Sequence, residues 1–192
     1  MPWLIVILGY FIGSIPTAYI AGHLTKGRDI RQMGDGNMGA RNAFFELGAK
    51  TGLGIFFIDV GKGALAILIA QAANISQAAV LLTGAAAVIG HNWPIFIGFR
   101  GGRGEATTIG VLLALITQPM IILVGPTLLA LLIFRNVILA SCVLFIPLPL
   151  VCWGLGVPGV LTTYGVALPC LVGFTHFLRT RRVVDTSGTG SA

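Results

Sequence analysis

Charged residues are scarce in this sequence. Only 9% of the 192 residues are Asp, Glu, Lys or Arg, whereas 56% are hydrophobic and the mean hydropathy is +0.94. Soluble domains carry roughly 25% charged residues, so the chain has too few charges to cover a soluble surface. The composition therefore excludes a soluble domain and predicts an integral membrane protein, and the length leaves room for one domain only.

Cysteine is equally scarce, and its placement excludes two kinds of site. Cys142, Cys152 and Cys170 lie in apolar segments without CxxC or His/Cys spacing, so neither a disulfide framework nor a metal site is indicated. We expect packing roles for all three, and no metal or cofactor. The net charge of +6 comes from basic residues beside the apolar runs. This placement favours membrane lipids and anionic substrates over nucleic acid as partners.

Long apolar runs are what the sequence does have. Residues 2–22 contain no charged residue. A run of this length is enough for a bilayer-spanning helix, which needs about 20 residues. No small-residue cleavage pattern follows a basic segment, so this run is expected to stay as a helix. Four further runs predict membrane spans, at residues 51–73, 78–89, 137–155 and 160–178.

The apolar run at residues 106–134 decides the number of helices. It is long for one helix and short for two, and Gln118-Pro119 interrupts it. If two short helices meet at Pro119, all the basic connections and the basic tail face one side, as the positive-inside rule favours. We therefore predict an all-α integral membrane bundle of about seven transmembrane helices, two of them short, with the amino terminus outside and glycine-rich loops in the cytoplasm. Residues 1–178 form this single domain, and residues 179–192 form a basic, then disordered, cytoplasmic tail.

The segment 90–108, GHNWPIFIGFRGGRGEATT, places two arginines among clustered glycines. Glycine lets backbone N–H groups approach an anion, while guanidinium groups supply charge and paired donors. The apolar helix that follows also presents its positive end here. We interpret this segment as an anion-binding loop and call its residues 98–104 the arginine loop. The alternative is a flexible connection anchored by positive charge. Its candidate ligands are Arg100, Gly101, Gly102, Arg103 and Gly104.

A second glycine-rich stretch, residues 34–42 (GDGNMGARN), has the G-x-G-x-x-G spacing of dinucleotide sites. Neither a buried strand nor a βαβ unit surrounds it, so that interpretation fails. A backbone nest for an anion remains, here called the glycine loop. The alternative is a structural turn in which asparagines cap backbone groups. The candidate ligands are Gly34, Gly36, Asn37, Gly39, Arg41 and Asn42.

Three ionisable residues stand out beside these loops. Asp59 and Lys62 lie three residues apart in a predicted span, hence on one helical face, and charge inside a membrane is costly unless it is paired. They are candidates to line a substrate cavity or to form an internal ion pair. His91 is the candidate proton carrier, with a helix-terminal cap as its alternative. Because no G-x-S-x-G motif or Ser-His-Asp order occurs, the site would work by holding two phosphorylated substrates together.

Four blocks of the sequence together resemble one family over nearly the full length: GSIPTAYIAG, MGDGNMGARNAFFELG, FIDVGKG and GHNWPIFIGFRGGRGEATTIGVLLA. The chain is similar to the bacterial membrane acyl-phosphate:glycerol-3-phosphate acyltransferases, the PlsY family. The resemblance implies transfer of a fatty acyl group from acyl phosphate to the 1-hydroxyl of glycerol 3-phosphate in the bacterial inner membrane. Lysophosphatidic acid is the implied product, with no need for acyl-CoA or a metal. The positions that match the family's motifs are Gly34, Gly36, Asn37, Gly39, Asn42, Asp59, Lys62, His91, Gly101, Gly102, Gly104, Ala106 and Thr107.

The sequence departs from the family at several loop positions. Asp35 stands where Ser is usual, and Arg41 replaces a usual Thr, where it can neutralise Asp35. Phe45 stands where Arg is common, and Glu105 where a small apolar residue is usual.

Arginine also replaces lysine at positions 100 and 103, which keeps the positive charge but gives up a removable proton. As a hypothesis for the mechanism, Arg100 and Arg103 hold acyl phosphate, with Arg103 and His91 as the catalytic residues. Arg41, Asn37, Asn42 and Lys62 would hold glycerol 3-phosphate, and Thr107 belongs to the binding set. Two alternatives remain, a degenerate paralogue that binds phosphorylated lipid without turnover and a small anion transporter.

Overall fold

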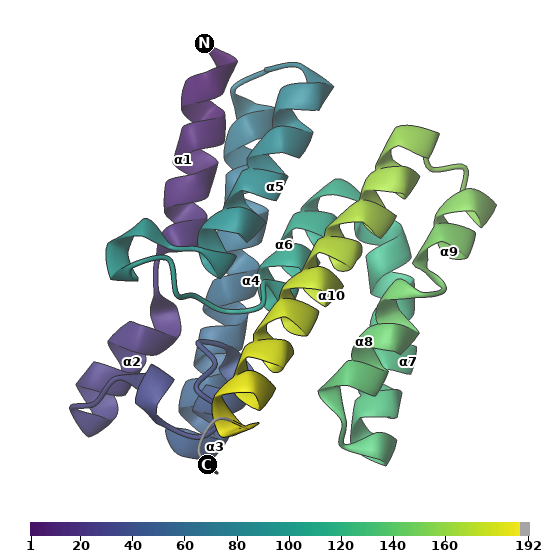
Figure 1. Cartoon of the computed structure of the whole chain (residues 1–192). Helices are drawn as coiled ribbons and strands as arrows, with labels where there is room; N and C mark the ends of the chain where they lie inside the picture. The colour runs from purple at the N-terminus through teal and green to yellow at the C-terminus, as the bar shows by residue number, and fades with distance from the viewer. Residues whose placement is uncertain (189–192) are drawn as a thin grey trace.

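The computed structural model describes residues 1–188, and every regular element within this range is helical. The long helices of the first half lie side by side, the last helix runs obliquely to them, and the shorter ones connect or bend them (Figure 1). The elements are α1 (Pro2–Ser14), α2 (Thr17–Lys26), η1 (Ile30–Gln32), α3 (Ala40–Glu46), α4 (Ala49–Ala72), α5 (Gln77–Asn92), η2 (Ile95–Ile97), α6 (Glu105–Leu115), α7 (Thr117–Phe134), α8 (Val137–Phe145), α9 (Leu148–Gly154) and α10 (Gly159–Gly188).

The predicted bundle of about seven helices is confirmed. Within the described residues, six segments are long and apolar enough to cross a membrane, and α6 is a shorter apolar helix beside them. The six segments are Pro2–Lys26, Ala49–Ala72, Gln77–Ile97, Thr117–Phe134, Val137–Gly154 and Gly159–Phe177.

The first predicted span is two helices, because Pro16 interrupts it. Proline has no N–H to donate and its ring clashes with the carbonyl four residues earlier in a helix, so α1 ends at Ser14 and α2 begins at Thr17. The two helices diverge at this point (Figure 1). At the break, the carbonyl oxygen of Ile15 accepts the N–H of Thr17 at 3.0 Å and no helical bond.

The predicted hinge in the run at 106–134 was placed three residues too late. Helix α6 ends at Leu115 and α7 begins at Thr117, so the break lies at Ile116. Pro119 falls in the first turn of α7, where the missing N–H would have no helical partner in any case. Of the two helices predicted to be short in this run, only α6 is short, since α7 has 18 residues and continues through Pro126.

Two other boundaries also differ from the predictions. The span predicted at 137–155 bends at Ile146-Pro147, where α8 gives way to α9. The tail predicted from residue 179 continues α10 as far as Gly188, because a preformed helix extends at little cost once it has been nucleated. The remaining part of the predicted tail, residues 189–192, lies outside the described residues.

Close helix crossings at glycine hold the first half of the bundle together. A Cβ atom on Gly13 would stand 2.0 Å from the carbonyl oxygen of Ala87, and one on Gly110 would stand 1.9 Å from that of Val60. These positions join α1 to α5 and α4 to α6, and small residues at such crossings let helix backbones pack in lipid. The crossings place the carboxyl-terminal end of α5 beside the middle of α4.

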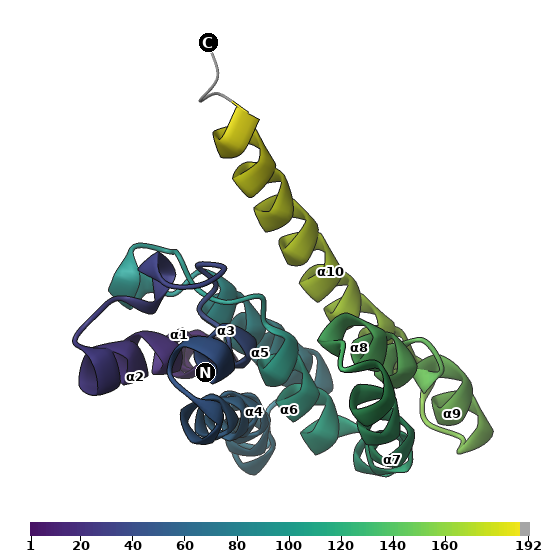
Figure 2. The same ribbon diagram turned by 90° about the horizontal axis from the view of Figure 1, so that it is seen from below.

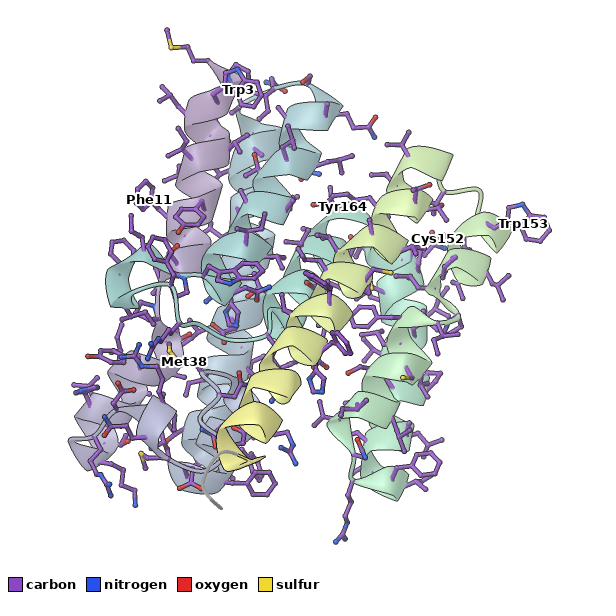
Figure 3. All side chains as sticks on the ribbon, in the orientation of Figure 1. Trp3, Phe11, Met38, Cys152, Trp153 and Tyr164 are labelled. Carbon is purple, nitrogen blue, oxygen red and sulfur yellow. The ribbon has the colours of Figure 1, made fainter. Side chains whose placement is uncertain are left out.

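The second half of the bundle packs around a core of buried side chains, including Leu112, Met120, Leu148 and Cys152. Cys152 therefore has the packing role that was predicted for it, whereas Cys142 and Cys170 are exposed on the surface. Trp153, the neighbour of Cys152, points outward from α9 (Figure 3).

The two ends of the bundle differ. The amino terminus lies at one end, and the connection from α2 to α3, the turn at Arg135 and the last turns of α10 lie at the other (Figure 1). Viewed from that end, α10 leans out from the bundle and projects beyond it (Figure 2). Three of the basic connections therefore lie at one end of the molecule, whereas the arginine loop, between η2 and α6, lies midway along the bundle (Figure 1).

Candidate active site

The buried carboxylate of Asp59 is the centre of a polar cluster inside the bundle. Lys62, one turn further along α4, has its ammonium 2.8 Å from Asp59 Oδ1, and the Thr17 hydroxyl donates to the same oxygen at 2.5 Å. His91 Nδ1 lies 3.7 Å from it. Asp59, Lys62 and His91 are each less than 10% exposed. Three helices, α2, α4 and α5, therefore converge on one carboxylate.

Lys62 also forms a hydrogen bond with the backbone at the break before Pro16. Its ammonium donates a hydrogen bond to the carbonyl oxygen of Ile15 at 3.1 Å. The internal ion pair that the sequence suggested is present, since Lys62 pairs with Asp59, and Lys62 also lines a small cavity. That cavity is bounded by Ser14, Ile15, Pro16, Thr17, Met38, Lys62, His91, Pro94 and Gly102.

The arginine loop folds back onto the end of α5. Backbone N–H groups of Gly101 and Gly102 donate to the carbonyl oxygens of Asn92 and His91, at 3.2 and 3.0 Å. A Cβ atom on Gly102 would stand 2.1 Å from His91 Nε2. Glycine is required here because any side chain would displace the imidazole, so the loop backbone fixes where His91 lies.

The two arginines of the arginine loop differ in their surroundings. Gly104 has a φ of +83° and precedes the first residue of α6, so the loop delivers its arginines directly to the start of that helix. Arg100 is exposed, whereas Arg103 is partly buried and its carbonyl oxygen accepts a hydrogen bond from Thr175 on α10 at 3.2 Å. Thr107 is fully buried, and its carbonyl faces Gly63 at the crossing with α4, which gives this predicted binding residue a packing position.

The glycine loop is organised by the buried side chain of Asn42. Its amide nitrogen donates to the carbonyl oxygens of Met33 and Asn37, both at 3.0 Å, and its oxygen accepts from the N–H of Asp35 at 3.2 Å. The geometry of Asn42 thus favours the structural alternative, a side chain that caps backbone groups. Gly34 and Gly36 have φ values of +55° and +68°, which is the left-handed conformation that glycine adopts most easily.

Asp35 joins the glycine loop to the arginine loop. Its Oδ1 accepts the N–H of Asn37 at 3.0 Å, and its Oδ2 lies 3.8 Å from Arg41 Nη1 and 3.7 Å from Arg103 Nη2. The expected neutralisation of Asp35 by Arg41 is therefore present, with Arg103 as a second partner. The structure brings the two predicted anion-binding loops together at this carboxylate.

Several residues of the site were missed by sequence reasoning. Thr17 and Ser14 flank the Pro16 break and line the cavity beside Lys62; a proline inside an apolar run is the signal that could have found them. The carboxylate of Glu105 accepts a short hydrogen bond from Ser141 on α8. This contact gives the unusual acidic residue a polar partner on a neighbouring helix.

Arg31 is another residue that the sequence did not single out. Its guanidinium binds the carboxylate of Asp29 and donates to the carbonyl oxygen of Ile97 at 2.9 Å. It also lies over the ring of Tyr19, 5.2 Å from the ring centroid. The hydrogen bonds from Arg31 hold the pKa of the Asp29 carboxyl below its usual value. Arg31 thereby fastens α2 and η1 to the segment that leads into the arginine loop.

Comparison with known proteins identifies the family. A family model described as glycerol-3-phosphate acyltransferase matches residues 3–186. Glycerol-3-phosphate acyltransferase 4 of Dehalococcoides mccartyi is 53% identical over 182 residues, which cover 95% of this chain and 98% of that protein. Glycerol-3-phosphate acyltransferase 1 of the same organism is 40% identical over 183 residues, covering 92% and 88% of the two chains.

Solved structures agree with this assignment. The crystal structure of PlsY, an integral membrane glycerol 3-phosphate acyltransferase, in its glycerol 3-phosphate form has a TM-score of 0.84 and 33% identity. The lysophosphatidic acid form has a TM-score of 0.76 and 29% identity. Each comparison covers 96% of this chain and 92% of the other. The chain therefore belongs to the glycerol-3-phosphate acyltransferase family of integral membrane enzymes.

Proposed function

We propose that this protein transfers a fatty acyl group from acyl phosphate to the 1-hydroxyl of glycerol 3-phosphate, giving lysophosphatidic acid and inorganic phosphate. The observation that carries this proposal is the meeting of two basic, glycine-rich loops beside the buried cluster of Asp59, Lys62 and His91. Two phosphate-bearing substrates need two sources of positive charge and backbone donors in one place, and family membership supplies the reaction class.

The arginine loop is assigned to the acyl phosphate. Arg100 and Arg103 supply guanidinium charge at the start of α6. The N–H groups of the two glycines between them already bond to the end of α5, so these glycines serve to position the loop against His91. The glycine loop, with Asn37, Arg41 and Asn42, is assigned to glycerol 3-phosphate. Asn42 would act by holding the loop in shape, since its amide already serves the loop backbone. Lys62 lies in the cavity between the two loops, within reach of an anion.

The reaction requires no protein nucleophile. The oxygen of the 1-hydroxyl attacks the acyl carbonyl carbon, a new ester C–O bond forms, and the C–O bond to phosphate breaks. The hydroxyl proton goes either to His91 or to an oxygen of the departing phosphate. Holding both substrates in line is the main contribution of the protein, and such orientation supplies several kcal/mol, up to roughly 7–11 in the best cases.

The proposed location is the bacterial inner membrane, with the amino terminus outside and the two loops in the cytoplasm. The position of three basic connections at one end of the bundle supports this orientation, because cytoplasmic connections carry an excess of Lys and Arg. Both substrates are anionic, so a loop end rich in positive charge also suits their approach.

The test uses purified protein in lipid, with palmitoyl phosphate and glycerol 3-phosphate as substrates. Lysophosphatidic acid and inorganic phosphate should appear together in equal amounts. A folded preparation that binds palmitoyl phosphate without turnover would instead support a lipid-binding paralogue. Release of phosphate without lysophosphatidic acid would show hydrolysis and would contradict the proposed acceptor.

A further inference from the structure

The carboxylate of Asp35 stands in an environment built for an anion. One oxygen accepts a backbone N–H in the glycine loop, and the other faces the guanidinium groups of Arg41 and Arg103. A backbone donor and two guanidinium groups form the donor set that recognises phosphate. An acidic side chain of the protein itself therefore occupies this position.

The contacts of Asp35 are of a kind that a substrate can displace. Both guanidinium distances exceed 3.5 Å, and the Asp35 side chain is 35% exposed. Exposed ion pairs of this geometry contribute little to stability. A phosphate group carries up to two charges and three strong acceptor oxygens, so it can make more and shorter hydrogen bonds with the same donors than the carboxylate makes.

We propose that Asp35 is an internal competitor, a carboxylate that pairs with Arg41 and Arg103 in the empty site and must move aside when a substrate phosphate binds. This inference rests on the proposed function, because it takes the two arginines to be phosphate ligands. The carboxylate weakens phosphate binding without taking part in acyl transfer. It also keeps the two loops together while no substrate is present.

The test compares two isosteric substitutions. In Asp35→Asn the side chain keeps an oxygen to accept the N–H of Asn37 but loses the charge that pairs with the arginines. Glu46→Gln is the matched control, because Glu46 lies beside Gly34 in the same loop region and the substitution removes the same charge. Equal thermal stability of Asp35→Asn and the parent protein would show that the loop is intact.

The expected result is a fall in KM. With Asp35→Asn, the KM for glycerol 3-phosphate, for palmitoyl phosphate or for both should fall roughly two- to fivefold, the size expected for loss of an exposed ion pair, with kcat changed less than about twofold. Inorganic phosphate should inhibit Asp35→Asn at correspondingly lower concentrations. The substrate whose KM falls is the one whose phosphate displaces the carboxylate. Glu46→Gln should leave all three values unchanged.

Three outcomes would overturn the inference. They are an unchanged KM for both substrates, a raised KM, which would make Asp35 a substrate ligand, and an equal shift in Glu46→Gln. If the parent protein shows no turnover, calorimetric binding of inorganic phosphate still separates the two claims. Tighter binding of phosphate by Asp35→Asn than by the parent protein would then support the competitor role although the proposed reaction fails. Equal binding of phosphate would contradict the competitor role as well.

Discussion

The ammonium of Lys62 donates a hydrogen bond to the carbonyl oxygen of Ile15, across two helices that the sequence places far apart. The carbonyl is available because α1 ends before Pro16, and the same ammonium lies 2.8 Å from Asp59. The ammonium of the buried ion pair thus bonds to a carbonyl at the end of the broken helix. This contact fixes α1 and α2 to the cluster of Asp59, Lys62 and His91.

Lys62→Met should be strongly destabilising. The substitution leaves the Asp59 carboxylate buried without its cation, which typically costs about 3–5 kcal/mol, and the apparent Tm in detergent should fall accordingly. The double variant Asp59→Asn/Lys62→Met removes both charges and should recover much of the lost stability, while remaining inactive. A stable, active Lys62→Met protein would contradict both the structural and the catalytic assignments.

Gly102→Ala should damage catalysis more than folding. The new Cβ would stand 2.1 Å from His91 Nε2, so the imidazole must move, and a displacement of about 1 Å at a reacting group can cost about 10²-fold in rate. The measurement is kcat/KM together with apparent Tm. Gly61→Ala is the control, because its Cβ meets nothing within 4 Å; loss of activity there as well would point to a general effect of glycine replacement.

Arg103→Ala should lower kcat/KM by about 10²–10³-fold, the usual cost of removing a donor that stabilises developing charge. The KM for acyl phosphate should rise more than that for glycerol 3-phosphate. Arg103→Lys should recover part of the activity, because it keeps the charge but loses the paired guanidinium donors. Arg135→Ala, at the exposed turn between α7 and α8, serves as the control. Full turnover in Arg103→Ala would remove the arginine loop from the proposed site.

The pair formed by Asp29 and Arg31 should make stability depend on pH in the acidic range. The pKa of Asp29 is lowered in the folded protein by its hydrogen bonds from Arg31, so its stabilising contribution is present above the unfolded pKa of about 3.9. That contribution is lost as the pH falls through the lower folded pKa.

The corresponding measurement is apparent Tm between about pH 6 and pH 3 for the parent protein and for Asp29→Asn. The variant should be less stable near neutral pH by no more than about 1 kcal/mol, the range of a surface pair, and the two curves should converge on acidification. A constant difference across this range would mean that the ion pair does not contribute.

The architecture was largely predictable from the sequence, because apolar runs of membrane-spanning length need no partner to be recognised. The two loops were predictable for a similar reason, since arginine and glycine chemistry is local. The contact between the two loops at Asp35 could be predicted only in part. Arg41 is close in sequence to Asp35, but Arg103 comes from a different loop, and only the helix crossings bring it there.

Helix ends and long-range polar contacts were harder to predict. The break at Ile116 lies three residues before Pro119, because a proline fits within the first turn of a helix and so does not mark its start. The roles of Thr17 and Ser141 depend on acidic residues far away in the chain. A hydroxyl in an apolar run can bond to its own helix, so the sequence alone gives no sign of such a partner.

The length of α6 has a consequence for how the membrane meets the protein. Eleven residues rise only about 16 Å, whereas the hydrocarbon core is about 30 Å thick, so lipid tails must fill the rest of the depth next to α6. Between α5 and α10, Tyr164 (Figure 3) donates to the carbonyl oxygen of Leu81 at 2.7 Å, beside an open groove that Val160, Thr163 and Ala167 also line. Because α6 starts directly after the arginine loop, we expect a lipid-like donor or product to reach that loop from the bilayer, without passing through water.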